Sequence, residues 1–309
     1  MIDSNHVKTT SRLARILTVL ALIAVVSVLA GCGDDDKDEG SGATGDTSAS
    51  ITGTLNEAAA AKVPQEIKDQ GTLTVAMDAS YAPNEFFDED GKTIIGMDAD
   101  LASAIGTTLG LDVKKQNVTF DAILPGLAAG KYDIAISSFT DTKEREETVD
   151  MVTYFTAGTG FYTNAENPVE VEGLADLCGK KVAVQKGTVQ QEDVEAQTEK
   201  CDQPIDISVF TQQTDVDLAI SSGKAEVALA DSPVAAYAVQ QSDGALKSTG
   251  KEYDSAPYGI AVNKDSGLTE AVQAAVQALI DDGTYTAILE KWGQTAGALD
   301  ESKINDGVE

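Results

Sequence analysis

The stretch FDAILPGLAAGKYDIAISSFTDTKERE, residues 120–146, decides the fold. Its first part, Asp121 to Ala129, has the apolar spacing of an amphipathic helix, and Tyr132 to Ile136 has the pattern of a buried strand. Two serines, Ser137 and Ser138, then end the apolar run. A helix that leads into a buried strand is typical of α/β proteins, in which helical crossovers join parallel strands. We therefore expect an α/β fold with polar side chains at the end of this strand.

The same alternation of strand and helix recurs along the chain. Further strands are predicted at Leu73–Met77, Lys181–Gln185, Ile205–Val209 and Val227–Ala230, and further helices at Asp98–Leu109, Val189–Lys200 and Asp215–Ser222. AGKYDIAISS, residues 129–138, resembles SGKAEVALAD, residues 222–231, and this alignment pairs Ser138 with Asp231. The pattern predicts two α/β lobes with polar groups at the carboxyl ends of equivalent strands, where ligands bind in open α/β sheets. A chance likeness between two buried strands is the alternative.

The first 31 residues have the pattern of a bacterial lipoprotein signal peptide. Lys8, Arg12 and Arg15 precede an apolar run over Ile16–Leu29, which is shorter than the about 20 residues of a membrane-spanning helix. The small residues of Leu-Ala-Gly then lead to Cys32. We expect cleavage before Cys32, lipidation of this cysteine and attachment to the extracytoplasmic face of the bacterial cell membrane. An uncleaved anchor is the alternative.

The composition is strongly acidic. The net charge is −29, and removal of residues 1–31, with one acid and three bases, makes it −31. Such a surface repels nucleic acid and anionic lipid, so we expect no nucleic-acid partner and membrane attachment only through the lipid. The only histidine, His6, lies in the predicted signal, which excludes a Ser-His-Asp triad, a Cys-His pair and histidine metal sites in the mature chain.

Two local features bear on metals and on disulfides. Asp88–Gly91 contains part of a calcium-loop pattern, but the later ligands are missing and a hairpin turn is the preferred interpretation, so we expect neither a metal nor a cofactor. Beyond Cys32 the chain has only Cys178 and Cys201, an even pair in an oxidising compartment. We expect a disulfide between them, which the chain-entropy model values at about 3 kcal/mol. Two separate buried thiols are the alternative.

Arg145 is the only arginine beyond the predicted signal, against eighteen lysines. Asp141 and Glu144 have the spacing of a capping box, so a helix is expected to begin at Asp141. The first turn of a helix favours an anion, and a guanidinium binds a carboxylate through two parallel hydrogen bonds. Arg145 is thus a candidate carboxylate-binding residue. An ion pair with Glu147 or Asp150 on an exposed helix face is the alternative.

Three further residues follow predicted strands and are candidates for the same site. Thr188, in the turn Lys186-Gly187-Thr188, offers a hydroxyl and lies beside free N–H groups. Asp231 opens a predicted helix, either as a ligand-binding acid or as an ordinary N-cap. Tyr81 is an aromatic residue in a loop, either at the site or in a satellite of the core.

Five segments together resemble the periplasmic-type solute-binding proteins of polar amino-acid ABC importers. They are GTLTVAMDASYAPNEFF, IIGMDADLASAIG, FDAILPGLAAGKYDIAISSFTDTKERE, GKKVAVQKGT and ALADSP, in this order between Gly71 and Gly293. The resemblance implies a two-lobe periplasmic-binding-protein type II fold, with two parallel-rich sheets flanked by helices and joined by a two-strand hinge. The chain would cross between lobes near Thr159–Thr163 and Pro257–Val262. Closure of the lobes would bury an L-amino acid.

The resemblance also implies how the charged ends of the amino acid are bound. Arg145 would bind the α-carboxylate, with help from Thr140 and Thr188. Asp231 in the second lobe would bind the α-ammonium, together with Ser137–Ser138. A zwitterion would then hold the two lobes together, because its two charges are bound by different lobes.

The side chain of the ligand would be enclosed by aromatic residues. Tyr81 and Phe120 would sandwich it, and Asp78 and Gln185 would contact its polar end. Asp78 and the acidity of the chain favour a polar or cationic side chain. Two departures from the family pattern leave this part of the pocket open: Asn84 replaces an aromatic residue and Val189 replaces a small polar residue.

The predicted organisation follows from these assignments. The predicted parts are a signal peptide over 1–31, a flexible acidic tether over 32–64, a first lobe over 65–160 plus 258–298, a second lobe over 161–257 and a tail over 299–309. We expect a monomer that delivers its amino acid to ABC permease subunits and is not an enzyme. The alternatives are a dehydratase-like enzyme acting on small carboxylates and a ligand-sensing domain of a receptor.

Overall fold

The computed structural model describes residues 51–309, so the predicted signal peptide and Cys32 lie outside the described residues. Eleven strands occur in this part of the chain. They are β1 (Thr72–Met77), β2 (Ser80–Tyr81), β3 (Glu85–Phe87), β4 (Ile94–Ile95), β5 (Asp112–Asn117), β6 (Ile134–Thr140), β7 (Asp150–Asn164), β8 (Lys181–Gln185), β9 (Asp206–Phe210), β10 (Val227–Asp231) and β11 (Leu246–Val262). The strands predicted from apolar runs are all present. β6 runs four residues further than expected and therefore includes both serines.

Helices alternate with these strands. They are α1 (Glu57–Ala61), α2 (Gln65–Gln70), α3 (Met97–Leu109), α4 (Phe120–Ala128), α5 (Lys143–Thr148), α6 (Val189–Thr198), α7 (Gln213–Ser221), α8 (Ser232–Gln241), α9 (Thr269–Asp281) and α10 (Thr284–Trp292), with short 3₁₀ turns η1 (Leu174–Leu177), η2 (Lys264–Ser266) and η3 (Thr295–Gly297). Within residues 51–309, none of the helices has both the length and the apolar character that crossing a membrane requires.

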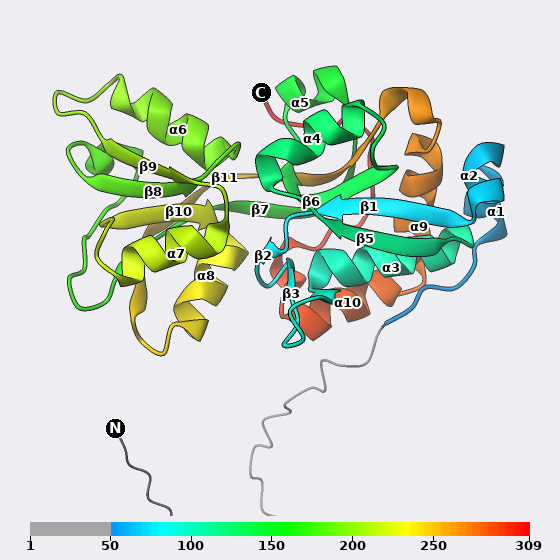
Figure 1. Cartoon of the computed structure of the whole chain (residues 1–309), viewed down its shortest axis with the longest axis horizontal. Helices are drawn as coiled ribbons and strands as arrows, with labels where there is room; N and C mark the ends of the chain where they lie inside the picture. Colours follow the sequence, from blue (N-terminus) through cyan, green and yellow to red (C-terminus); the bar gives the residue numbers. More distant parts are fainter. Residues whose placement is uncertain (1–50) are drawn as a thin grey trace, which may run out of the picture. The chain divides into compact units, whose positions relative to one another are not determined.

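Eight strands form a single sheet in the order β5-β1-β6-β11-β7-β10-β8-β9, and β2, β3 and β4 form a small second sheet. We call the part built on β5, β1 and β6 the first lobe, and the part built on β10, β8 and β9 the second lobe. The antiparallel strands β7 and β11 run between the lobes in Figure 1. Two sheets joined by a two-strand hinge were expected, and in the structure this join makes one continuous sheet. The structure joins them because these two strands, of 15 and 17 residues, pair with each other in both lobes.

β6 and β10 occupy equivalent places in the two lobes. β6 pairs in parallel with β1 and antiparallel with β11, whereas β10 pairs in parallel with β8 and antiparallel with β7. The likeness between residues 129–138 and 222–231 therefore reflects equivalent positions in the fold. As a result, the carboxyl ends of β6 and β10 both lie beside the strands that join the lobes.

Each lobe has its own hydrophobic core. In the first lobe, Val75 and Ile136 of the sheet pack in one buried cluster with Ile105 of α3 and Val276 of α9. In the second lobe, one cluster contains Ala183, Val216 and Ala228, and another forms on the opposite face of the sheet around Val184 and Val194. Helices cover the sheet on both faces (Figure 1). Each lobe is thus a layered α/β unit with its own core.

Part of the segment expected to be a flexible tether is folded. Residues 57–61 form α1, where Asn56 caps the helix and Ala59 is buried against α9. The backbone N–H of Asn56 also donates a hydrogen bond to the carbonyl of Thr108. The low complexity of residues 33–62 concealed these contacts, because alanine gives no apolar periodicity of its own.

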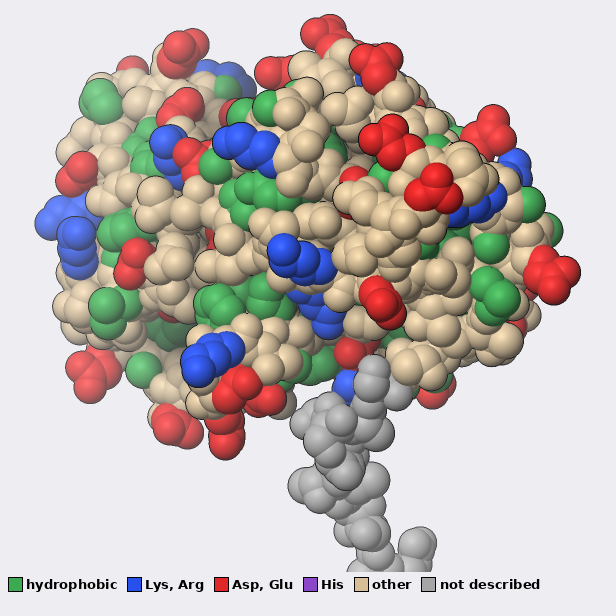
Figure 2. All heavy atoms as spheres, turned by 45° about the vertical axis from the view of Figure 1, so that its right-hand side comes forward, with side chains coloured by type: hydrophobic (Ala, Val, Ile, Leu, Met, Phe, Trp, Pro, Cys, Tyr) green, Lys and Arg blue, Asp and Glu red, His purple; other side chains and the backbone are tan. Residues whose placement is uncertain are grey.

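Two other expectations can be checked directly. Cys178 and Cys201 form a disulfide with a Cα–Cα distance of 5.5 Å. Asp88–Gly91 forms the turn between β3 and β4, where an Asp90 oxygen accepts the N–H of Thr93. Among the described residues, no group of three or more His, Cys, Asp or Glu side chains is placed to hold a metal ion. In Figure 2 the Asp and Glu side chains are scattered over the visible face and form no single patch.

Candidate functional site

A small cavity lies where the two lobes meet. Its lining comprises Tyr81, Phe120, Ser138, Thr140, Arg145, Gln185, Thr188, Val189, Gln190 and Asp231. Eight of the ten residues predicted from the sequence are among them, and only Asp78 and Ser137 are not. The structure thus brings together residues from loops and strand ends up to 150 positions apart in the chain, as between Tyr81 and Asp231.

The cavity encloses about 10 Å³. A cavity of about 10–15 Å³ holds one water molecule, so an amino acid does not fit in this conformation. A second cavity of about 190 Å³ adjoins it and shares Thr140, Val189, Gln190 and Asp231. The described conformation is therefore a closed one, and a ligand can enter only when the lobes separate.

Arg145 projects from α5 into the cavity. One guanidinium nitrogen donates to the carbonyl of Thr140 at 2.9 Å, and the other donates across the lobes to the carbonyl of Gly187 at 3.1 Å. The guanidinium carbon lies 5.7 Å from the ring centre of Phe120 and 5.5 Å from that of Phe139. Burial lowers the pKa of Arg145, but an arginine stays charged in proteins.

The charge of Arg145 is not taken up by a carboxylate. Within residues 51–309 it forms no ion pair, so the proposed pairing with Glu147 or Asp150 is absent. Its two carbonyl partners are neutral acceptors, which an anionic group would replace with a charge-assisted bond. The cavity therefore presents a half-buried cation that, among the described residues, lacks a counter-ion at contact distance.

The predicted capping box at Asp141 is wrong. The N-cap of α5 is Thr142, whose hydroxyl accepts the backbone N–H of Arg145. Asp141 is instead buried, and its pKa is raised to about 7, chiefly by burial and also by Glu146. The sequence did not reveal the burial of Asp141. The six residues of α5 are polar and none of them is buried, so nothing in their pattern indicates that the residue before the N-cap is covered.

Asp231 lies at the end of β10, on the other side of the cavity from Arg145. Its Oδ1 accepts the side-chain amide of Gln190 at 2.8 Å, and its backbone N–H donates to the Tyr81 hydroxyl at 3.1 Å. Although Asp231 precedes α8, its side chain makes no capping hydrogen bond, so the ordinary N-cap role does not apply. Burial raises the pKa of this carboxyl group.

Asp78 and Ser137 lie behind the cavity wall. An oxygen of Asp78 accepts the backbone N–H of Phe120 at 3.0 Å and the amide of Gln185 at 2.9 Å. Ser137 accepts the N–H of Asp78 and donates to Glu85 at 2.6 Å. In this conformation both residues support the site through hydrogen bonds and do not line its cavity.

Direct contacts hold the lobes together around the cavity. The Gln185–Asp78 and Arg145–Gly187 hydrogen bonds cross between the lobes, as does an ion pair of 2.8 Å between Lys186 and Asp121. Gly187 has φ +79°, and a Cβ at this position would lie 3.1 Å from the Cβ of Asp121. A glycine is therefore required where the two lobes approach each other.

Sequence reasoning missed Gln190. This residue is buried in the first turn of α6, where its amide donates both to Asp231 and to the Thr159 hydroxyl at 2.9 Å. Its position two residues after Thr188 could have indicated a role in the site. Side chains in the first turn of a helix that follows a strand lie at the carboxyl end of that strand, where Thr188 also lies. A glutamine in a helix otherwise resembles an ordinary solvent-exposed residue.

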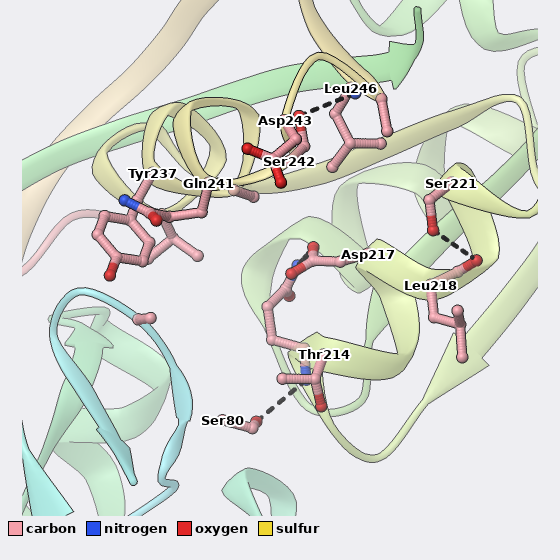
Figure 3. Close-up of a pocket in the computed structure, with 15 residues that line it drawn as sticks. Ser80, Thr214, Asp217, Leu218, Ser221, Tyr237, Gln241, Ser242, Asp243 and Leu246 are labelled. Atoms are coloured by element: carbon pink, nitrogen blue, oxygen red, sulfur yellow. Dashed lines mark hydrogen bonds between the residues drawn. The ribbon is translucent and has the colours of Figure 1, made fainter. Parts of the chain in front are cut away.

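A larger cavity of about 450 Å³ lies in the second lobe between α7 and α8 (Figure 3). Its lining includes Asp217, Leu218 and Tyr237 but none of the ten predicted site residues. Ser80 forms one end, where its hydroxyl accepts the backbone N–H of Gln213 at 3.1 Å across the lobes. This cavity is roomier than the one between the lobes, but its lining has acidic side chains and no Lys or Arg, so it lacks the paired opposite charges of the smaller cavity.

Two α/β lobes joined by a pair of long strands, with opposite charges facing one cavity, define the class of bacterial solute-binding proteins. Within this class, the chain belongs to the bacterial extracellular solute-binding proteins, family 3, whose pattern it matches over residues 73–295. The homologues of this chain are non-enzymatic amino-acid-binding proteins, which favours binding over the dehydratase alternative.

Similar proteins support this assignment. The arginine-binding protein ArgT of Corynebacterium glutamicum is 38% identical over 253 residues, which cover 80% of this chain and 82% of that protein. The L-cystine-binding protein TcyJ of Escherichia coli is 27% identical, over 74% of this chain and 84% of that protein. The solved structure of an ancestral arginine-binding protein bound to arginine is 36% identical with a TM-score of 0.68, and the match covers 72% of this chain and 98% of that one.

Proposed function

We propose that this protein captures L-arginine, or a chemically similar polar amino acid, outside the cytoplasmic membrane and passes it to an ABC permease. The observation that carries the proposal is that Arg145 and Asp231 come from different lobes and line the same cavity. A ligand with a carboxylate and an ammonium group bridges them. Such a ligand stabilises the closed state over the open one, because only closure brings both charges to it.

The amino-acid backbone is expected to replace contacts that the site residues make with one another. The α-carboxylate takes the place of the Gly187 carbonyl on Arg145, with Thr140 and Thr188 beside it. The α-ammonium binds Asp231 and the neighbouring oxygens of Ser138. The rings of Tyr81 and Phe120 line the remaining space, as the predicted sandwich requires.

Arginine is favoured as the ligand for three reasons. The relative with 38% identity is an arginine-binding protein, and a structure with 36% identity holds arginine. The chain is acidic, with a net charge of −29, which favours the approach of a cationic ligand. Asp78 is buried behind Gln185, so a small movement of Gln185 would expose a carboxylate to a cationic side chain.

We also propose that Cys32 carries the lipid that attaches the protein to the membrane. The support is the sequence pattern before this cysteine, which lies outside the described residues. Mass spectrometry of the protein from its native membrane is expected to show the acylated Cys32 at the amino terminus. A Cys32→Ser variant is expected to be released into the medium or periplasm, and a membrane-bound variant would contradict lipid attachment.

Calorimetric titration with a panel of amino acids tests the ligand. We expect L-arginine to bind in the micromolar range or tighter, which corresponds to about −8 kcal/mol or more. Tight binding of L-cystine with no binding of arginine would move the assignment to another polar amino acid. No binding across the panel would contradict the proposal as a whole, and native mass spectrometry of freshly purified protein checks whether a co-purified ligand already fills the site.

A further inference from the structure

Two acidic side chains are buried behind the cavity wall in the first lobe. Glu85 of β3 and Asp98 of α3 are both 0% exposed, and their carboxyl groups interact as close neighbours. Two carboxylate ions in contact repel each other strongly where water is excluded. One of the two carboxyl groups must therefore carry a proton.

The hydrogen bonds show which group carries it. Asp98 Oδ2 accepts the Tyr154 hydroxyl at 2.8 Å and the Ser138 backbone N–H at 2.9 Å, whereas Glu85 Oε1 accepts only the Ser137 hydroxyl at 2.6 Å. A carboxylate with more donors is better stabilised as the ion, so Asp98 is the ionised partner. The remaining oxygens, Glu85 Oε2 and Asp98 Oδ1, are buried without a hydrogen-bond partner. A proton on Glu85 satisfies both.

The surroundings of the pair keep this proton in place. The groups that face it from other elements are acids: Asp78 after β1, Tyr81 of β2 and Tyr154 of β7. Burial raises the pKa of Glu85 well above its ordinary value, with a further rise from Asp98, and burial raises the pKa of Asp98 to about 6. Glu85 is thus neutral at the pH at which an exposed glutamate is charged.

The pair holds Ser138 in an unusual backbone conformation. Ser138 has φ +51°, a left-handed conformation that costs a residue other than glycine about 1–2 kcal/mol. Its N–H is held by Asp98, and its hydroxyl accepts the amide of Asn84 at 2.8 Å. Since Ser138 lines the cavity, this conformation decides which of its polar atoms meet the ligand.

We propose that Glu85 and Asp98 share one proton and act as positioning residues, which hold Ser138 in the conformation that binds the amino acid. Loss of the proton at high pH creates a second buried negative charge and releases Ser138. Ligand affinity then falls as the pH rises. The predicted effect on ligand affinity rests on the function proposed above. The sharing of a proton between Glu85 and Asp98 does not.

The variant Glu85→Gln is the sharpest test, because its amide donates to Asp98 in place of the proton but cannot ionise. Titration with L-arginine from about pH 7 to about pH 9 covers a range in which ordinary carboxyl groups no longer titrate. We expect the wild type to lose at least about threefold in affinity relative to Glu85→Gln, which keeps near wild-type affinity at neutral pH. Glu89→Gln, in the exposed turn beside β3, is the matched control and is expected to follow the wild type.

A second measurement needs no ligand. Carbon-13 NMR of the Glu85 carboxyl group is expected to show the protonated form at neutral pH, and the Ser138 amide is expected to exchange slowly with solvent until the proton is lost. In Asp98→Asn, Glu85 is expected to ionise at lower pH because its acidic neighbour is gone. An ionised Glu85 at neutral pH, or equal pH profiles for Glu85→Gln and the wild type, would overturn the proposal. If arginine does not bind the wild type, the proposed function fails, and the NMR titration still decides whether the proton is shared.

Discussion

The strands β6 and β10 occupy equivalent places in the two lobes but bring different chemistry to the cavity. At β6, the carboxyl groups of Glu85 and Asp98 do not line the cavity and instead accept hydrogen bonds from Ser137 and Ser138. At β10, the carboxylate of Asp231 itself lines the cavity. The cation of the site, Arg145, follows β6 and not β10. Equivalent scaffolds thus carry opposite charges, and the proposed zwitterionic ligand would satisfy both.

Of the changes that test this division of charge between the lobes, replacement of Arg145 is expected to have the largest effect on ligand affinity. Arg145→Ala removes the only Lys or Arg side chain that lines the cavity, so binding of L-arginine is expected to weaken about 100-fold or more, from the loss of about 3 kcal/mol. Arg145→Lys keeps the charge but cannot form the two parallel hydrogen bonds, so its affinity is expected to lie between that of the wild type and that of Arg145→Ala. Calorimetry measures both, with thermal unfolding as a check on folding. Wild-type affinity in Arg145→Ala would show that the carboxylate is bound elsewhere.

Removal of the opposite charge in the second lobe is expected to cost less. Asp231→Asn keeps the shape and the bond to Gln190 but leaves the ligand ammonium without a counter-ion, so affinity is expected to fall about 10- to 100-fold. Asp217→Asn is the matched control, because Asp217 belongs to the same lobe and lines a different cavity. Equal losses in both variants would indicate damage to the lobe and not the loss of a contact.

Acidification is expected to reproduce the Asp231→Asn effect gradually. Burial raises the pKa of Asp231, so this carboxylate is neutralised at a higher pH than an ordinary aspartate as the pH falls. Affinity is therefore expected to decline on acidification starting above about pH 4, the ordinary aspartate value. The same titration in Asp231→Asn is expected to lack this component. An unchanged profile would mean that another acid binds the ammonium.

The ion pair between Lys186 and Asp121 is expected to make a smaller contribution to closure. Both side chains are partly exposed, and such pairs contribute about 0.2–1 kcal/mol. Lys186→Ala is expected to weaken ligand binding up to about fivefold, and less so at high salt. Lys251→Ala is the control, since the 3.7 Å pair of Lys251 with Glu172 lies at the periphery of the second lobe. A loss that does not depend on salt would indicate a direct ligand contact.

The disulfide of the second lobe is expected to have the smallest effect on binding. Removal of Cys178 and Cys201 together is expected to lower the free energy of unfolding by about 3 kcal/mol, because the unfolded chain gains freedom. Affinity is expected to stay within about twofold, since neither cysteine lines a cavity of the site. Chemical denaturation and calorimetry on the same sample separate the two quantities. A large loss of affinity would mean that the disulfide helps to hold the residues of the cavity in place.

Local pattern was sufficient to predict the elements that position the site. The apolar runs of β1 and β8 and the spacing in α3 are set by residues close together in the sequence, and their positions agree with the structure within two residues. The single continuous sheet was not predictable in this way. It depends on the pairing of β7 with β11, whose residues lie about a hundred positions apart.

The site was predictable where a residue type is rare and less so where it is common. Arg145 is conspicuous because no other arginine occurs beyond residue 15. Gln190 and Glu85 are not, since glutamines and glutamates are mostly exposed and only burial gives these two their roles. Asp141 was wrongly predicted as an N-cap for a similar reason: the spacing of a capping box does not show whether the residue will be buried in the folded protein.

The carboxyl-terminal tail has a practical consequence for experiments on this protein. Residues 302–305 bind along β7, and Val308 bridges to Thr142 at the start of α5. Val308 and Glu309 also line the cavity of about 190 Å³ that adjoins the candidate site. A purification tag fused after Glu309 would begin beside this cavity, where it would hinder the entry of solute. Recombinant versions are therefore better tagged ahead of residue 51.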